Sequence, residues 1–280
     1  MKLVLAVCEG EHDVAFVHRS ARILGGFAPF ERSIGSYPVP LGAGLSGSPP
    51  AAQFLTRRLQ RQGLETAALE MATRPQLPAL TGALRDKTGD VLLLTLRSHG
   101  FSHRQEVRTF LEDLFLTLDA VVSKEITSCA TAFFVDADED GCAARAEEVA
   151  ASFGDLWGAA TLIPGQWVTS PRGPLGVFVF CAPGATDGSL EDGLAPLMQS
   201  HLGSYWVAAE AFIDGHAAAD AKVKRARRHR LKAVITAAGQ FDRPGNPMSE
   251  MIRHDALPSA VFRTSPEAAK LVAFLEAVPW

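Results

Sequence analysis

The stretch from Lys2 to Leu24, KLVLAVCEGEHDVAFVHRSARIL, decides the fold. It begins with a continuous apolar run, Lys2 to Cys8, which is typical of a strand buried on both faces. An acidic turn follows, and apolar residues then recur at helical spacing from His12 to Leu24. This order of strand, tight acidic turn and helix predicts the first unit of an α/β protein.

The rest of the chain repeats this alternation. Further buried strands are expected at Asp90–Leu96, Cys129–Val135, Ala160–Pro164 and Leu175–Cys181. Further helices are expected at Arg104–Val122, at Cys142–Phe153, from about Ser189, and at Pro266–Leu275. The alternation predicts an α/β fold with an open, mainly parallel sheet and helices on both faces.

The chain length and the spacing of these elements suggest how the domain is organised. We expect residues 1–200 to form an α/β core and residues 201–280 to pack on it as a basic, mostly helical extension. Residues 35–88 are expected to form an inserted cap. The segment from Gly25 to Pro50 is rich in Gly, Pro and Ser, which predicts a long surface loop, and a helix is expected after it at about Ala51–Ala72.

The composition excludes several classes of protein. No apolar run approaches the roughly 20 residues of a membrane span, and Met1 to Val7 has the pattern of a strand and not of a signal peptide. The four cysteines form no C-x-x-C pair, which favours reduced thiols, a cytoplasmic location and no structural zinc. The net charge of −4 argues against a protein that coats nucleic acid non-specifically.

Acidic residues follow two of the predicted strands. Glu9 and Asp13 follow the first strand, and Asp136, Asp138 and Asp140 follow Cys129–Val135. In an open α/β sheet the loops at the carboxyl ends of the strands carry ligands, so we expect these two loops to meet. Carboxylates gathered this closely raise each other's pKa unless a cation compensates, and an all-oxygen set favours Mg²⁺ or Mn²⁺ over zinc.

The two acidic stretches resemble the motifs of the Toprim domain, the catalytic fold of topoisomerases, bacterial primases and overcoming-lysogenization-defect nucleases. VCEGEHDVAFV, from Val7, is similar to the first Toprim motif, and FFVDADEDG, from Phe133, is similar to its Asp-x-Asp motif. SLEDGL at Ser189–Leu194 and KVKR after Ala221 more loosely resemble a group of uncharacterised bacterial Toprim-like proteins.

The resemblance implies roles for individual residues. Glu9 resembles the Toprim glutamate that binds metal or transfers a proton, and Asp136 and Asp138 resemble the metal-holding pair. Asp13 and Asp140 would be further ligands or would orient bound water, although Asp13 could equally cap the first helix. Two further acids, Glu191 and Asp192, could belong to the site, or could instead complement the dipole of the helix that starts there. Three cations could bind phosphates, or could instead form a solvated helix face: Lys222, Lys224 and Arg225.

Three functions are considered. The resemblance implies metal-dependent hydrolysis of phosphodiester bonds in nucleic acid, in nucleic-acid processing or phage defence. The alternative is a non-catalytic Toprim-like module that binds nucleic acid or a nucleotide through the same site. A minor alternative is a calcium-binding loop, since residues 136–147 match the EF-hand pattern, although a strand-like run precedes them where an EF-hand needs a helix.

Two activities of the wider Toprim group are not expected. A topoisomerase needs a nucleophilic tyrosine, and neither Tyr37 nor Tyr205 has a recognisable setting; a primase needs zinc-binding and helicase-contact regions that the chain lacks. No ATPase motif is present either, so an ATPase that works with this protein would be a separate chain.

Overall fold

The computed structural model describes residues 1–30, 37–41, 79–98, 100, 103–120, 125–159, 161–216, 227–242, 244–245, 247–253 and 257–280. The predicted helix at about Ala51–Ala72 and most of the predicted loop up to Pro50 lie outside these residues. So do all three predicted phosphate-binding cations: Lys222, Lys224 and Arg225.

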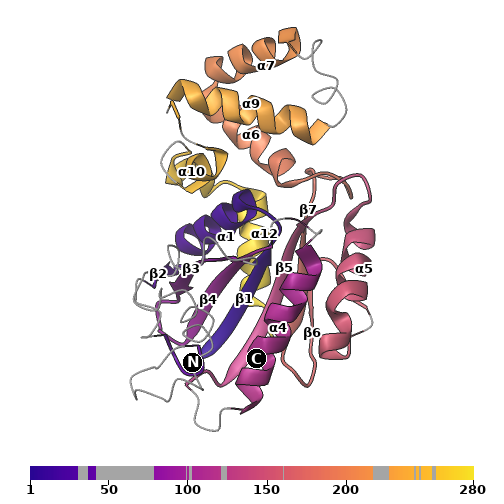
Figure 1. Ribbon diagram of the computed structural model, residues 1–280. Helices are drawn as coiled ribbons and strands as arrows, with labels where there is room; N and C mark the ends of the chain where they lie inside the picture. The colour runs from indigo at the N-terminus through magenta and orange to yellow at the C-terminus, as the bar shows by residue number, and fades with distance from the viewer. Residues whose placement is uncertain are drawn as a thin grey trace.

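The fold is built on one mixed sheet of seven strands, in the order β2-β3-β4-β1-β5-β7-β6 (Figure 1). Its four central strands are parallel: β4 (Val91–Arg97), β1 (Lys2–Cys8), β5 (Ser128–Asp136) and β7 (Leu175–Phe180). The flanking strands run antiparallel to their inner neighbours: β2 (Ala28–Pro29), β3 (Ala79–Arg85) and β6 (Gln166–Val168). Because β1 lies between β4 and β5, the loops that leave all three strands open at the same edge.

Helices cover both faces of the sheet, because successive side chains of a strand point to opposite faces. Leu3, Leu5 and Val7 of β1 pack in one core with α4 (Arg104–Ala120) and α5 (Cys142–Phe153), which is followed by the 3-10 turn η4 (Gly154–Trp157). The alternate residues Val4, Ala6 and Cys8 pack in a second core with α1 (Glu11–Ile23) and α12 (Pro266–Glu276). Both faces are therefore buried, which explains the continuous apolar strands.

The C-terminal helices extend this second core beyond the sheet. They are α6 (Leu190–Leu202), α7 (Ser204–His216), α9 (Arg227–Asp242), α10 (Met248–Arg253) and α11 (Ser259–Phe262). Figure 1 shows α6, α7 and α9 stacked beyond the carboxyl ends of the parallel strands, while α12 returns to the sheet. There the Trp167 ring of β6 stacks on Phe274 at 4.6 Å, and its indole N–H donates to the Phe274 carbonyl.

The structure confirms the α/β class, the largely parallel sheet and most of the predicted strands and helices. The strand predicted at Ala160–Pro164 is wrong: the described part of this segment is irregular, and the strand that follows is β6. The segment resembled a strand because Leu162 is apolar, and this side chain is buried in the core without its backbone pairing in the sheet. The last part of the expected insertion, Ala79–Arg85, is a strand of the main sheet.

Candidate functional site

A cavity of about 450 Å³ opens at the carboxyl edge of the sheet, under the helices beyond it. Its walls come from the turn after β1, the segment after β4, the ends of β4 and β5, the first turns of α1 and α6, and α9. The titratable side chains that line it include six from these elements: Glu9, His12, Asp13, Asp136, Glu191 and Lys232. The structure thus brings together acids from both predicted loops.

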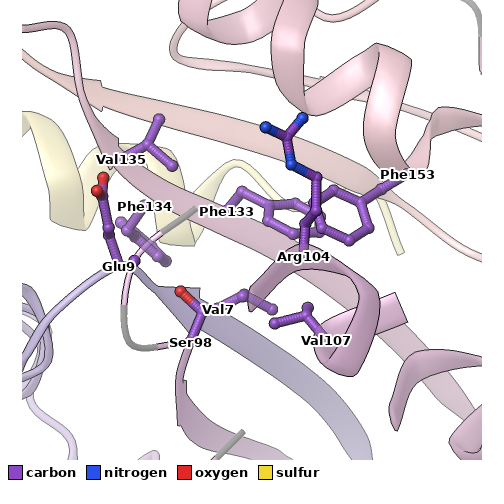
Figure 2. Close-up of a pocket in the computed structure, with 10 residues that line it drawn as sticks. Val7, Glu9, Ser98, Arg104, Val107, Phe133, Phe134, Val135 and Phe153 are labelled. Carbon is purple, nitrogen blue, oxygen red and sulfur yellow. The ribbon is translucent and has the colours of Figure 1, made fainter. Parts of the chain in front are cut away.

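The backbone of Glu9 is fixed between the two neighbouring strands. Its N–H donates to the Phe134 carbonyl (3.2 Å), and its carbonyl accepts from the Gly100 N–H (2.9 Å). In Figure 2 the Glu9 carboxylate points away from the apolar side chains of Val7 and Phe133. The Arg104 guanidinium is paired with Glu148 and Ser152 of α5 (3.3 and 3.2 Å). The cavity drawn there has a volume of about 10 Å³, roughly the space of one water molecule, and is too small for a substrate.

Asp136 is held at the start of α6. It is the last residue of β5 and is 8% exposed, and its Oδ1 accepts a hydrogen bond from the Leu190 N–H (2.9 Å). This N–H is one of the unpaired donors of the first helical turn, where a carboxylate is stabilised by the helix dipole. The contact therefore brings β5 and α6 together and places Asp136 beside Glu191.

Glu191 is the most buried acid of the site, at 1% exposure. Its Oε1 lies 3.3 Å from both His12 Nδ1 of α1 and Lys232 Nζ of α9. Its Oε2 is buried and has no hydrogen-bond partner among the residues that the structure describes. A buried carboxylate oxygen without a partner is costly, so this atom points to a ligand that would satisfy it.

Asp13 has two roles in the structure. Its Oδ2 accepts from the Gly10 N–H (2.7 Å), so it caps α1, as one of the two predictions for it required. It is also 6% exposed and lies within electrostatic reach of Glu9, Asp136 and Glu191. Capping and membership of the acidic cluster are thus compatible.

The electrostatics show how close these four acids are. Burial, followed by the charges of Glu191 and Glu9, raises the pKa of Asp136 to about 7. Burial, followed by the charge of Asp136, also raises the pKa of Asp13. Burial alone would raise the pKa of Glu191, but the hydrogen bond with His12 and the charge of Lys232 outweigh it and lower that pKa. The surroundings therefore favour the charged form of Glu191 and the protonated forms of Asp136 and Asp13.

Three of the predicted acids lie elsewhere. Asp138 is not among the residues that line the cavity, and its carboxylate pairs with Arg145 of α5 (2.5 Å). Asp140 is exposed beside it, and Asp192 accepts from the N–H and hydroxyl of Ser189, which caps α6. The segment 136–147 begins at the last residue of β5 and ends within α5. A strand therefore precedes it, whereas the loop of an EF-hand is preceded by a helix.

Two basic residues of the cavity were missing from the predicted site. Arg97 is the last residue of β4. Because ligands bind at the carboxyl ends of parallel strands, a search for basic as well as acidic residues at these ends would have found it. Lys232 ends the basic run of the sequence, Lys222 to Lys232, but its place in the cavity depends on how α9 packs against α6 and α7 beyond the sheet, which no local pattern shows.

Within the part of the chain that the structure describes, no three His, Cys, Asp or Glu side chains are already arranged as a metal-binding group. The acids are neighbours, but their oxygens do not converge on one point. The same described residues include no helix with the length and apolar character that a bilayer span requires.

No protein-family model and no curated protein matches this sequence. Among solved structures, the chain is similar to the crystal structure of a hypothetical protein from Pyrococcus horikoshii OT3, with 14% sequence identity and a TM-score of 0.49. The similarity covers 99% of this chain and 95% of that one.

Proposed function

We propose that the protein is a Toprim-like nuclease, which hydrolyses phosphodiester bonds in nucleic acid with Mg²⁺ or Mn²⁺ in the acidic cavity. The observation that supports this most is the cluster of Glu9, Asp13, Asp136 and Glu191, which come from two strand exits and two helix starts. Four carboxylates at the ligand-binding edge of an α/β sheet have a functional explanation more readily than a structural one.

The residues of the cavity suit a hard divalent cation. All the acidic donors are oxygen atoms, and the pKa of Asp136 is raised by burial and then by its acidic neighbours. Among the described residues, Glu191 Oε2 has no hydrogen-bond partner. A cation would remove the mutual repulsion and satisfy that atom. Because the oxygens do not yet converge, binding would need rotations of the Glu9 and Glu191 side chains.

The residues that line the cavity would have different roles in such a reaction. The bound cation would supply polarisation of a phosphodiester and activation of water. Glu9, Asp136 and Glu191 would hold it, and Asp13 would hold the turn that carries Glu9. His12, whose ring lies at Glu191 and is 31% exposed, is placed to move a proton at the mouth of the cavity. Arg97 and Lys232 supply positive charge for phosphate oxygens.

The basic run extends this proposal to nucleic acid. Lys232 places α9 at the cavity, and the run that contains Lys222, Lys224 and Arg225 leads into this helix in sequence. We infer that these cations bind the phosphates of a strand that enters the cavity. Arg230 does not contribute in the same way, because it pairs with Asp214 of α7 (2.7 Å).

One observation favours the non-catalytic alternative. Only Asp136 of the Asp-x-Asp pair lines the cavity, because Asp138 is engaged with Arg145. A Toprim-like module that binds nucleic acid or a nucleotide without cleaving it would not need both aspartates of the pair to hold a metal ion.

Cleavage assays separate these two functions. Labelled single- and double-stranded DNA and RNA are incubated with Mg²⁺ or Mn²⁺ and the wild type, Glu9→Gln, Asp136→Asn or Asp138→Asn. The proposal predicts metal-dependent cleavage that falls by at least about 100-fold in the first two variants. Asp138→Asn is the matched control, since its carboxylate lies outside the cavity. Binding without cleavage by the wild type would instead support the non-catalytic module.

A further inference from the structure

The helix α7 presents an apolar face to solvent. Figure 1 shows α7 as the outermost of the helices stacked beyond the sheet, at the top of the view. One side of this helix is buried in the second core through Trp206 and Ala209, which are 2% and 0% exposed. On the other side, Val207 and Phe212 are 64% and 56% exposed. A surface helix normally presents charged residues to water, so an apolar outer face indicates a partner.

The acidic side chains of α7 are turned toward the neighbouring helix. Glu210 and Asp214 both pair with Arg230 of α9, at 3.6 and 2.7 Å. An uncharged face with acids at its border does not suit the phosphates of nucleic acid or of anionic lipids, which bind to clustered cations. An apolar protein surface suits it better.

The middle of this outer face is a row of small residues. They are exposed and follow one another at spacings of four, three and four positions: Ser204, Ala208, Ala211 and Gly215. This spacing is that of the contact positions of a coiled coil, and small side chains at such positions let two helices approach closely.

The row is complementary to itself, because its spacing is the same in both directions along the helix. When two copies of α7 lie antiparallel, Ser204 of each faces Gly215 of the other, and Ala208 faces Ala211. A surface that matches its own copy in this way is the requirement for a twofold symmetric dimer.

We propose that the protein forms a dimer in which two copies of α7 pack antiparallel along these small residues. The positive N-terminal end of each helix then lies beside the negative C-terminal end of the other, which favours this orientation. On one side of the row, Phe212 of one copy lies beside Tyr205 of the other, which is 47% exposed. The inference does not depend on the proposed nuclease activity, because the described residues that line the cavity include none from α7.

The exposed area of the face sets the strength of the dimer. The exposed parts of Tyr205, Val207 and Phe212, together with the small residues, amount to on the order of 400 Å² per copy. Two copies would cover on the order of 800 Å², which is less than the roughly 1,200 Å² of most stable complexes. We therefore expect reversible association with a dissociation constant between about 1 and 100 µM.

The test is sedimentation velocity of the whole chain from about 1 to 300 µM, a range that spans this constant. The expected result is a monomer–dimer equilibrium that persists in about 0.5 M NaCl, because the contact is apolar. Ala211→Glu places a charge on the row of small residues and should raise the dissociation constant at least about 50-fold. Phe212→Ala should raise it at least about fivefold. The matched control is Ala151→Glu, at an exposed position of α5, which should dimerise like the wild type.

Other outcomes would overturn the inference. They are a wild type that stays monomeric at every concentration, a dimer whose affinity is unchanged in Ala211→Glu, and a dimer that salt dissociates. The first outcome is expected if another part of the same chain covers the face. Because Ala211 is exposed, its glutamate variant should fold, and circular dichroism spectra verify this.

Discussion

At the scale of single residues, Asp136 connects the fold to the chemistry of the cavity. Its carboxylate binds the first N–H of α6, yet its acidic neighbours and its burial raise its pKa to about 7. A structural cap alone would be better served by an acid that is ionised throughout the physiological range. Carboxyl groups with strongly raised pKa values are common at functional positions, so this shift agrees with the proposed cation site.

This raised pKa makes stability depend on pH. In the unfolded chain Asp136 loses its proton near its ordinary pKa of 3.8, whereas in the folded chain it keeps the proton up to about 7. The folded state thus binds more protons between these values, so chelator-treated protein should lose stability as the pH rises from about 4 to 7. Asp13, whose pKa is also raised, acts in the same direction.

Thermal melting at pH 5 and pH 8 checks this prediction. The fall in melting temperature between them should be smaller in Asp136→Asn, and Asp138→Asn should keep the wild-type fall. Mn²⁺ should restore the wild type at pH 8 far more than at pH 5, because protons compete with the cation. Equal pH dependence in wild type and Asp136→Asn would refute the role given to this carboxylate.

At the scale of elements, α1 links the sheet to the C-terminal helices through one buried side chain. Arg19 of α1 is 4% exposed, and its guanidinium donates to the carbonyls of Ile252 and Leu257 and lies 4.7 Å from the Phe262 ring. Ile252 belongs to α10, Leu257 lies two residues before α11, and Phe262 belongs to α11. Arg19 thereby holds the segment that connects α9, and with it Lys232, to the core.

Removal of this side chain should loosen the C-terminal helices. Arg19→Ala leaves two carbonyls without their donor and opens a cavity, so the free energy of unfolding should fall by about 3 kcal/mol. The matched control is Arg22→Ala on the exposed face of the same helix, which should change it by less than about 0.5 kcal/mol. Urea unfolding curves measure both. A loss in Arg19→Ala no greater than in the control would contradict this role.

The strands of the sheet differ in how well the sequence predicts them. β1, β4, β5 and β7 were predicted because strands buried on both faces leave a continuous apolar signal. β3 left none, since its sequence ALTGALR is interrupted by Gly82. A Cβ atom at this glycine would lie 2.3 Å from the His18 ring of α1. The glycine is thus required by the close approach of His18, a contact between elements far apart in the sequence that no local pattern predicts.

At the scale of the whole molecule, the position of the site was predictable but its membership was not. The acidic strand exits predicted the edge of the sheet and the convergence of Glu9 with Asp136. They also suggested Asp138, because sequence spacing does not show that Asp138 turns toward Arg145. Conversely, the sequence favoured a helix-start role for Glu191, because only the packing of α1 and α9 shows that His12 and Lys232 lie against it.

Calorimetric titration of the chelator-treated protein with Mn²⁺ at pH 8 measures whether the acids of the cavity hold a divalent cation, as we propose. The wild type and Asp138→Asn should bind Mn²⁺ with similar affinity. Asp136→Asn and Glu191→Gln should each weaken binding by at least about tenfold, or roughly 1.4 kcal/mol. Absence of binding in the folded wild type, or equal binding in all four proteins, would contradict the account.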